Sequence, residues 1–309
     1  MAGLLDILAP VIAVIAVGYF LARGGVITPA GETGISNLVF FATTPALLFR
    51  AMATTGLPTL PDLAVMAAYF GPCLLLYGGW AFSRHRLFGS GLAAAGIGAM
   101  GASFGNTVLL GIPIVDRAYG PAGLRLLVLI VSIHSALLFT MTTLLAEAER
   151  GRADASATLA ATARMMSRNP IVLAIAAGVA CAALGLRLPG TLDAVLAMLG
   201  AATTPAALIA VGAGLAGFRL GDSLGESAAI AAAKMVALPL AVWVMATQLL
   251  ALEPIAVAVA TVAAAIPTGT NVYIIARRYD VSVSIAAGAI LLSTLLALAT
   301  VPLVIAGLR

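Results

Sequence analysis

The sequence predicts an all-helical (all-α) membrane protein with ten transmembrane helices, arranged as two inverted repeats of five. Three observations indicate this fold. Hydrophobic residues make up 62% of the chain and charged residues only 9%, whereas a soluble domain carries about 25% charged residues. The chain divides into ten apolar runs separated by turn residues. Short motifs also recur after about half of the chain.

Each apolar run is long enough, or nearly so, to cross the hydrocarbon as a helix of about 20 residues. Strands are not expected, because an open sheet edge would leave its backbone groups unpaired in lipid. Turns rich in Gly and Pro separate the runs. The expected spans are residues 3–22, 34–55, 61–83, 91–115, 121–146, 170–186, 191–217, 224–250, 254–276 and 283–307.

Two pairs of similar segments indicate that the chain consists of two similar halves. Thr43-Thr44-Pro45-Ala46-Leu47-Leu48 recurs as Thr203-Thr204-Pro205-Ala206-Ala207-Leu208, and Gly105-Asn106-Thr107-Val108 is echoed by Thr270-Asn271-Val272. The expected units are a first five-helix repeat at 1–147, a linker at 148–168 and a second repeat at 169–309. Because each half holds an odd number of helices, the second half must enter the membrane from the opposite side.

The distribution of arginine predicts the orientation in the membrane. Cytoplasmic loops carry an excess of Lys and Arg, and ten arginines fall on one side of the expected spans against four on the other. We therefore expect a multi-pass protein of the cell (inner) membrane, with both termini outside and the 147–169 loop in the cytoplasm. The ten are Arg23, Arg84, Arg86, Arg150, Arg152, Arg164, Arg168, Arg219, Arg277 and Arg278, and the four are Arg117, Arg125, Arg187 and Arg309.

The fourth and ninth runs each contain a cluster of helix-breaking residues. The fourth holds Gly101-Ala102-Ser103-Phe104-Gly105-Asn106-Thr107 and then Gly111-Ile112-Pro113, and the ninth holds Ile266-Pro267-Thr268-Gly269-Thr270-Asn271. Pro and Gly disfavour a continuous helix, although a simple kink is the alternative. The clusters occupy corresponding places in the two halves, and each carries an Asn. We therefore expect unwound backbone that lines a cavity, with Pro113 and Pro267 as the helix breakers.

Two broken helices would point two half-helix N-termini at one region. Each N-terminus carries roughly half a positive charge, which favours an anion such as a carboxylate. The first candidate ligands are the Asn106 and Asn271 amides. Further candidates from the same clusters are Gly105, Thr107, Thr268, Gly269 and Thr270. A membrane protein of two similar, interrupted halves is typical of a transporter whose site lies where the halves meet.

Two titratable cations inside the expected spans are further candidates. Lys234 lies near the middle of the eighth run and His134 in the middle of the fifth. Either could contribute charge or proton transfer. The alternatives are a lysine that snorkels to the interface and a core histidine bonded to a neighbouring helix. No carboxylate is expected at the midplane, so coupling to H⁺ or Na⁺ would use His134, backbone carbonyls or the proton of the substrate itself.

The chain resembles the auxin efflux carrier family, in particular its bacterial branch of malonate- and malate-type carriers. The resemblance rests on Pro45-Ala46-Leu47-Leu48-Phe49, on Gly105-Asn106-Thr107 with Gly111-Ile112-Pro113, and on Pro267 with Asn271-Val272. It implies a bile-acid-symporter-like fold. In this fold spans 1, 2, 6 and 7 form a scaffold, spans 3–5 and 8–10 form a core, and spans 4 and 9 cross at their breaks.

The resemblance also implies a function. Members of the family carry carboxylates without a cofactor, by elevator-type alternating access, and often as homodimers, here through the scaffold helices. Asn106 and Asn271 take the crossover position of the family motif.

Two other functions remain open from the sequence. Gly101-Ala102-Ser103-Phe104-Gly105 matches the Gly-x-Ser-x-Gly pattern of serine hydrolases, and with His134 it would suggest an intramembrane protease. That pattern needs a strand-to-helix turn, and a protease would not explain the repeat. A passive anion channel is the second alternative. No metal-site motif, phosphate-binding loop or nucleic-acid-binding pattern is present in the sequence.

Overall fold

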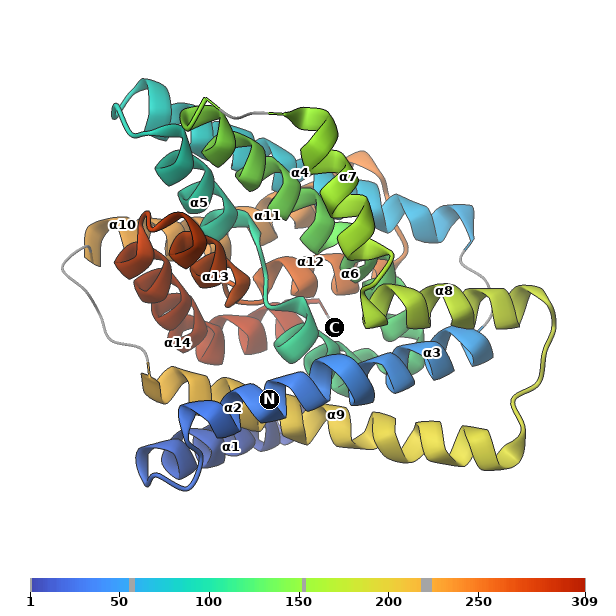
Figure 1. Ribbon diagram of the computed structural model, residues 1–309. Coiled ribbons are helices and arrows are strands. Elements are labelled where there is room, and N and C mark those ends of the chain that lie inside the picture. Colours follow the sequence, from blue (N-terminus) through green and yellow to red (C-terminus); the bar gives the residue numbers. More distant parts are fainter. Residues whose placement is uncertain (1, 56–58, 152–153, 218–223, 309) are drawn as a thin grey trace.

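The computed structural model describes residues 2–55, 59–151, 154–217 and 224–308 (Figure 1). In these ranges the chain is helical apart from its turns and one isolated pair of bridged residues. The prediction of an all-helical protein is therefore confirmed. Arg152, Arg219 and Arg309, which were used to predict the orientation, lie outside the described residues.

Six helical stretches of the described chain are long and apolar enough to cross a membrane. They are Pro29–Thr54, Asp62–Arg86, Thr107–Glu149, Gly190–Gly217, Leu224–Leu249 and Val283–Gly307. Four shorter apolar helices accompany them: Ile12–Arg23, Leu92–Ser103, Pro170–Ala183 and Pro254–Ala265. A multi-pass membrane protein is thus supported, while the count of ten spans, the repeat boundaries and the inversion of the second half stay predictions.

The fourth and fifth expected spans differ from the long apolar helices that the structure shows, and the reason is local. The expected fourth run is interrupted between α5 (Leu92–Ser103) and the π-helical turn η2 (Thr107–Gly111). Helix α6 (Ile112–Glu149) then continues from η2 through the expected fifth run. It bends sharply at Gly120, whose φ of 60° is a backbone conformation that favours glycine. A bend, and not a loop, therefore separates the fourth and fifth expected spans.

The helices pack into two groups, which we call the lower and the upper group after their places in Figure 1. The lower group contains α1 (Ala2–Arg23), α2 (Pro29–Leu38), η1 (Val39–Thr43), α3 (Thr44–Thr55), α8 (Pro170–Ala183) and α9 (Gly190–Gly217). The upper group contains α4 (Leu60–Arg86), α5, η2, α6, α10 (Leu224–Ala232), η3 (Ala233–Ala237), α11 (Leu238–Val244), η4 (Met245–Leu249), α12 (Pro254–Ala265), α13 (Asn271–Tyr279) and α14 (Val283–Gly307).

Helix α7 (Ala155–Met166) follows α6 in the polar connection and packs beside it. The Asp154 carboxylate accepts hydrogen bonds from the Ala157 N–H at 3.0 Å and the Ser156 hydroxyl at 2.7 Å. These bonds lower the pKa of the Asp154 carboxyl, the Ala157 amide contributing most.

Small residues bring α1 and α9 of the lower group into close contact. A Cβ atom on Gly18 or Gly212 would overlap the backbone of the facing helix, at Ile209 and Ile15 respectively. Such close backbone packing is typical of helix association in membranes. The Arg50–Asp193 ion pair, 2.7 Å long, joins α3 to α9.

Polar contacts hold the upper group together. Arg84 pairs with Glu226 at 2.9 Å between α4 and α10. Arg125 pairs with Asp62 at 3.2 Å between α6 and α4. Tyr77 bonds to Thr142, and Tyr279 donates to Glu147, at 2.9 Å in each case. Each ion pair found among the described residues thus joins two members of one group.

Candidate functional site

The two helix breaks meet in space. The Asn106 N–H donates to the Pro267 carbonyl at 2.8 Å, and the Gly269 N–H donates to the Phe104 carbonyl at 3.0 Å. These two bonds form an antiparallel bridge between Gly105 and Thr268. We call the paired segments, residues 104–106 and 266–270, the crossing.

Local chemistry explains why both helices end here. The residues that follow the last helical positions, Phe104 and Ile266, are extended, with ψ of 112° and 135°. Pro267 lies inside the second break, where it has no amide to donate. Gly269 is required by close approach, because a Cβ there would lie 2.6 Å from the Phe104 ring. Pro113 lies at the second position of α6, which continues from η2 without a break, so the interruption lies before it, at residues 104–106.

Two helix starts with unpaired amides lie at the crossing. The N–H groups of Thr107 and Val108 and those of Thr270 and Asn271 donate to no group in the described part of the chain. The first amides of a helix have no partner within it. Nothing else in the described structure satisfies them, so they can receive an acceptor.

The candidate side chains differ in accessibility. Asn106 and Asn271 are half-buried, Thr270 is exposed, and Gly105 and Gly269 are buried. We find no hydrogen bond to the Asn106 or Asn271 amide group from any described residue. An amide group has two donors and one acceptor to offer. These two side chains therefore remain available to a ligand.

Thr268 is engaged within the protein. Its hydroxyl donates to the Gly101 carbonyl at 2.9 Å, and its amide donates to the Ser293 hydroxyl at 3.1 Å. Thr268 is 1% exposed and Thr107 4%. Thr268 therefore stabilises the crossing, and both threonines are buried.

His134 stabilises the backbone of the crossing through a hydrogen bond from Gly105. Its ring is fully buried, and its Nε2 accepts the Gly105 N–H at 3.2 Å. Since Nε2 is the acceptor, the ring is neutral and its proton lies on Nδ1, 3.4 Å from the Tyr69 hydroxyl. Phe104 packs on the ring with centroids 4.6 Å apart. The histidine has no open path to a ligand in this conformation.

Lys234 lies in η3 and is also fully buried. Its ammonium group donates to the carbonyl of Ala264, in the last turn of α12. A cation there complements the negative end of the helix dipole. The alternative that Lys234 snorkels to the membrane surface does not fit this contact.

The protease alternative does not fit the geometry. Ser103 is completely buried, and its hydroxyl is without a hydrogen-bond partner among the described residues. Both nitrogens of His134 contact other groups, Gly105 and Tyr69. A serine nucleophile needs a base within hydrogen-bond reach and access for its substrate.

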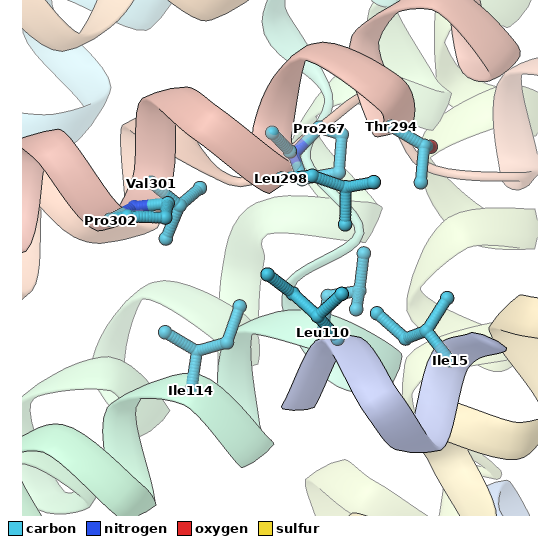
Figure 2. A pocket seen from close by; sticks show the side chains of 10 residues that line it. Ile15, Leu110, Ile114, Pro267, Thr294, Leu298, Val301 and Pro302 are labelled. Atoms are coloured by element: carbon cyan, nitrogen blue, oxygen red, sulfur yellow. The ribbon is translucent and has the colours of Figure 1, made fainter. Parts of the chain in front are cut away.

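A pocket borders the crossing on the side of the lower group (Figure 2). Pro267 of the crossing and Leu110 of η2 form part of its wall. Ile15 of α1 faces them, and Thr294 and Leu298 of α14 close another side. The complete lining is Ile12, Ile15, Leu110, Ile114, Pro267, Thr294, Ala297, Leu298, Val301 and Pro302.

Sequence reasoning missed the contributions of α14 and α1. Ser293 binds the crossing, and Thr294, Leu298 and Val301 line the pocket. One signal was available, because Ser293 and Thr294 are adjacent hydroxyl residues near the middle of an apolar run. Ile15 has no such signal, since an isoleucine that faces a pocket looks in sequence like one that faces lipid.

Comparison with known proteins agrees with this architecture. A model of the membrane transport protein family matches residues 4–305. The chain belongs to this family, which confirms the resemblance to the auxin efflux carriers, and it is a transporter and not an enzyme. A protein of Rhizobium meliloti (strain 1021) named "Putative malonate transporter" is 28% identical to it, over 97% of this chain and 94% of the relative.

Proposed function

We propose that this transporter carries small organic anions with a carboxylate group, and that the carboxylate binds at the crossing. The observation that supports this most is the coincidence of two helix starts and two unpaired amide side chains, Asn106 and Asn271. Helix N-termini favour anions through their free N–H groups and their dipoles. Thr107 and Thr270 complete the proposed site. Gly105 and Gly269 shape it without binding the anion, because their N–H groups donate to His134 and to the Phe104 carbonyl.

We assign positioning roles to Lys234 and His134. Both hold backbone groups of the helices that form the crossing, the Ala264 carbonyl and the Gly105 amide. A charge on Lys234 would also favour an anion at the crossing through space. In this proposal neither side chain touches the substrate.

We propose elevator-type alternating access, in which the upper group moves as one body against the lower group. Each ion pair found in the described structure lies within one group. The pocket where the groups meet is walled almost entirely by apolar side chains. An apolar contact without charge pairs can slide at little cost, because no buried ion pair has to break. The lower group is then the scaffold.

The sequence pattern supports two further features of the proposal, an inverted repeat of five helices and both termini outside the inner membrane. The resemblance to the auxin efflux carriers supports a third, a homodimer through the lower group. Coupling to H⁺ or Na⁺ would involve backbone carbonyls at the breaks or the proton of the substrate.

Uptake into proteoliposomes tests the proposed site. A panel of mono- and dicarboxylates would be offered with and without a sodium or pH gradient. The double variant Asn106→Ala with Asn271→Ala should lose uptake, since both amide ligands are removed. Asn37→Ala, which truncates an exposed asparagine of α2, should keep it. Transport by the double variant at the wild-type rate would refute the site.

A counterflow experiment distinguishes a carrier from a passive channel. An alternating-access carrier exchanges labelled for unlabelled substrate and saturates. A flux that rises linearly with concentration and shows no exchange would favour the channel.

A further inference from the structure

The break after α12 leaves backbone carbonyls without helical partners. The last four carbonyls of a helix have none within it, and Pro267 has no N–H that could bond to the Ala263 carbonyl. These carbonyls lie at the negative end of the α12 dipole. In transporters with interrupted helices, such carbonyls and helix ends coordinate sodium ions. The end of α12 is therefore where a coupling sodium ion would be expected.

A lysine occupies this position. Lys234 reaches the end of α12 from η3, and its ammonium group donates to the Ala264 carbonyl. The side chain is completely buried. Two cations do not share one group of carbonyls inside a membrane, because like charges repel strongly where the effective dielectric constant is low. The ammonium group therefore excludes a sodium ion from the end of α12.

The corresponding end of α5 has only neutral partners. The Gly101 carbonyl accepts the Thr268 hydroxyl at 2.9 Å. The Ser103 carbonyl faces the Cys73 thiol, whose sulfur is 3.8 Å away. Among the described residues, a cation thus binds the released carbonyls at the second break and neutral groups bind those at the first.

The charge of Lys234 has no acidic partner in the described part of the chain, since none of the ion pairs there includes this residue. A buried ammonium group without a counter-ion is strongly unfavourable. Ala264 lies two residues before the crossing, so an anion bound there would supply the missing negative charge. A sodium ion would contribute a contact with the carbonyls and a positive charge, and the ammonium group contributes both.

We propose that the Lys234 ammonium group takes the place of a coupling sodium ion, so that this carrier works without sodium. Lys234 is then a positioning residue, which holds the end of α12 beside the crossing and supplies positive charge to the bound anion. The inference rests on the proposed function and decides one point left open there, because it removes sodium from the two coupling ions considered.

Thermal unfolding in detergent tests the inference without a substrate. Lys234→Ser removes the ammonium group, leaves room beside the Ala264 carbonyl and adds a hydroxyl ligand. A sodium ion should then bind, and NaCl should raise the unfolding midpoint of this variant above its value in the same concentration of choline chloride. The midpoint of the wild type should be the same in both salts. The matched control is Val236→Ser in the same turn, which should behave like the wild type because Val236 is 53% exposed.

Uptake of radiolabelled malonate, as a small carboxylate probe, into proteoliposomes tests the role in transport. The wild type should take it up equally in both salts. Lys234→Ser should lose uptake by about tenfold or more in choline chloride, and uptake should return and saturate as NaCl replaces choline chloride. Lys234→Met fills the space with an apolar chain and should stay inactive in both salts, which separates rescue by sodium from a general effect of salt.

The two measurements separate this inference from the proposed function. Sodium-dependent stability and uptake that appear only in Lys234→Ser support the inference. A wild type that requires sodium, or a Lys234→Ser variant whose midpoint is the same in both salts, overturns it and leaves the crossing as the proposed carboxylate site. Stabilisation by sodium without restored uptake overturns the role in transport. Full uptake by the Asn106→Ala, Asn271→Ala variant overturns the proposed function instead, while the midpoint still decides whether a sodium ion can replace the ammonium group.

Discussion

At the scale of single residues, the crossing depends on buried groups that satisfy its backbone. Two helices that break inside a membrane release amides and carbonyls that water cannot reach. His134 takes up the Gly105 N–H, Thr268 the Gly101 carbonyl, and Ser293 the Thr268 N–H. Lys234 takes up the Ala264 carbonyl. These contacts fix the backbone and leave the first amides of η2 and α13 unpaired.

Removal of the His134 acceptor should destabilise the protein. His134→Leu leaves the buried Gly105 N–H without a partner, which costs about 1–3 kcal/mol. His134→Gln retains an acceptor and should lose less. Denaturant unfolding in detergent would measure both, with Ser135→Ala on the same helix as the control. Equal stability of His134→Leu and the wild type would contradict the assigned role.

The sequence indicated which polar residues lie at or near the crossing, but not which groups they bind. Asn106, Asn271, Lys234 and His134 stand out because a polar group in hydrocarbon is costly and needs a reason. The sequence did not reveal that His134 and Lys234 bind backbone groups, whereas the two asparagine amides have no partner among the described residues. That distinction depends on which helices lie side by side. Contacts between residues far apart in the chain cannot be recognised from the local sequence pattern.

At the scale of elements, proline positions explain several irregular helices. The π-helical turns η1, η2 and η3 each end two residues before a proline, at Pro45, Pro113 and Pro239 respectively. The proline ring clashes with the carbonyl four residues earlier, and a widened turn moves that carbonyl away. The sequence alone does not predict which prolines have such a turn, because Pro72, Pro205 and Pro302 lie inside helices without one. Nor does it predict the sharp bend at Gly120, because Gly120-Pro121 is also compatible with a loop.

The contact of α1 with α9 gives a second prediction. Gly212→Ala adds a Cβ that overlaps the backbone of α1 near Ile15, so the helices must separate at a cost of about 1–3 kcal/mol. Gly217→Ala on the same helix meets nothing within 4 Å. It should be neutral or stabilising, because alanine is the better helix former. Thermal unfolding in detergent compares the two, and similar losses in both would argue against close packing at Gly212.

At the scale of the whole molecule, the lower and upper groups are each held internally and meet across an apolar contact. Cross-linking tests whether they move against each other. In a background with Cys73→Ala and Cys181→Ala, which removes the two native cysteines, Ile15→Cys and Leu298→Cys place thiols on opposite walls of the pocket (Figure 2). Joining them with a short bifunctional thiol reagent should abolish uptake, because it fixes one group to the other.

Two controls accompany this experiment. Arg50→Cys with Asp193→Cys, at an ion pair inside the lower group, should cross-link without loss of transport. Each single pocket cysteine treated with the same reagent shows how much inhibition comes from filling the pocket. Full uptake by the Ile15–Leu298 cross-linked protein would contradict an elevator motion.

We propose that the two helix breaks form one carboxylate site. A cryo-electron microscopy structure of the protein with a bound transported carboxylate tests it most directly. We predict that the carboxylate lies within hydrogen-bond distance of the Asn106 and Asn271 amides and of the first N–H groups of η2 and α13. A carboxylate bound elsewhere, with both asparagines unliganded, would contradict a site at the crossing.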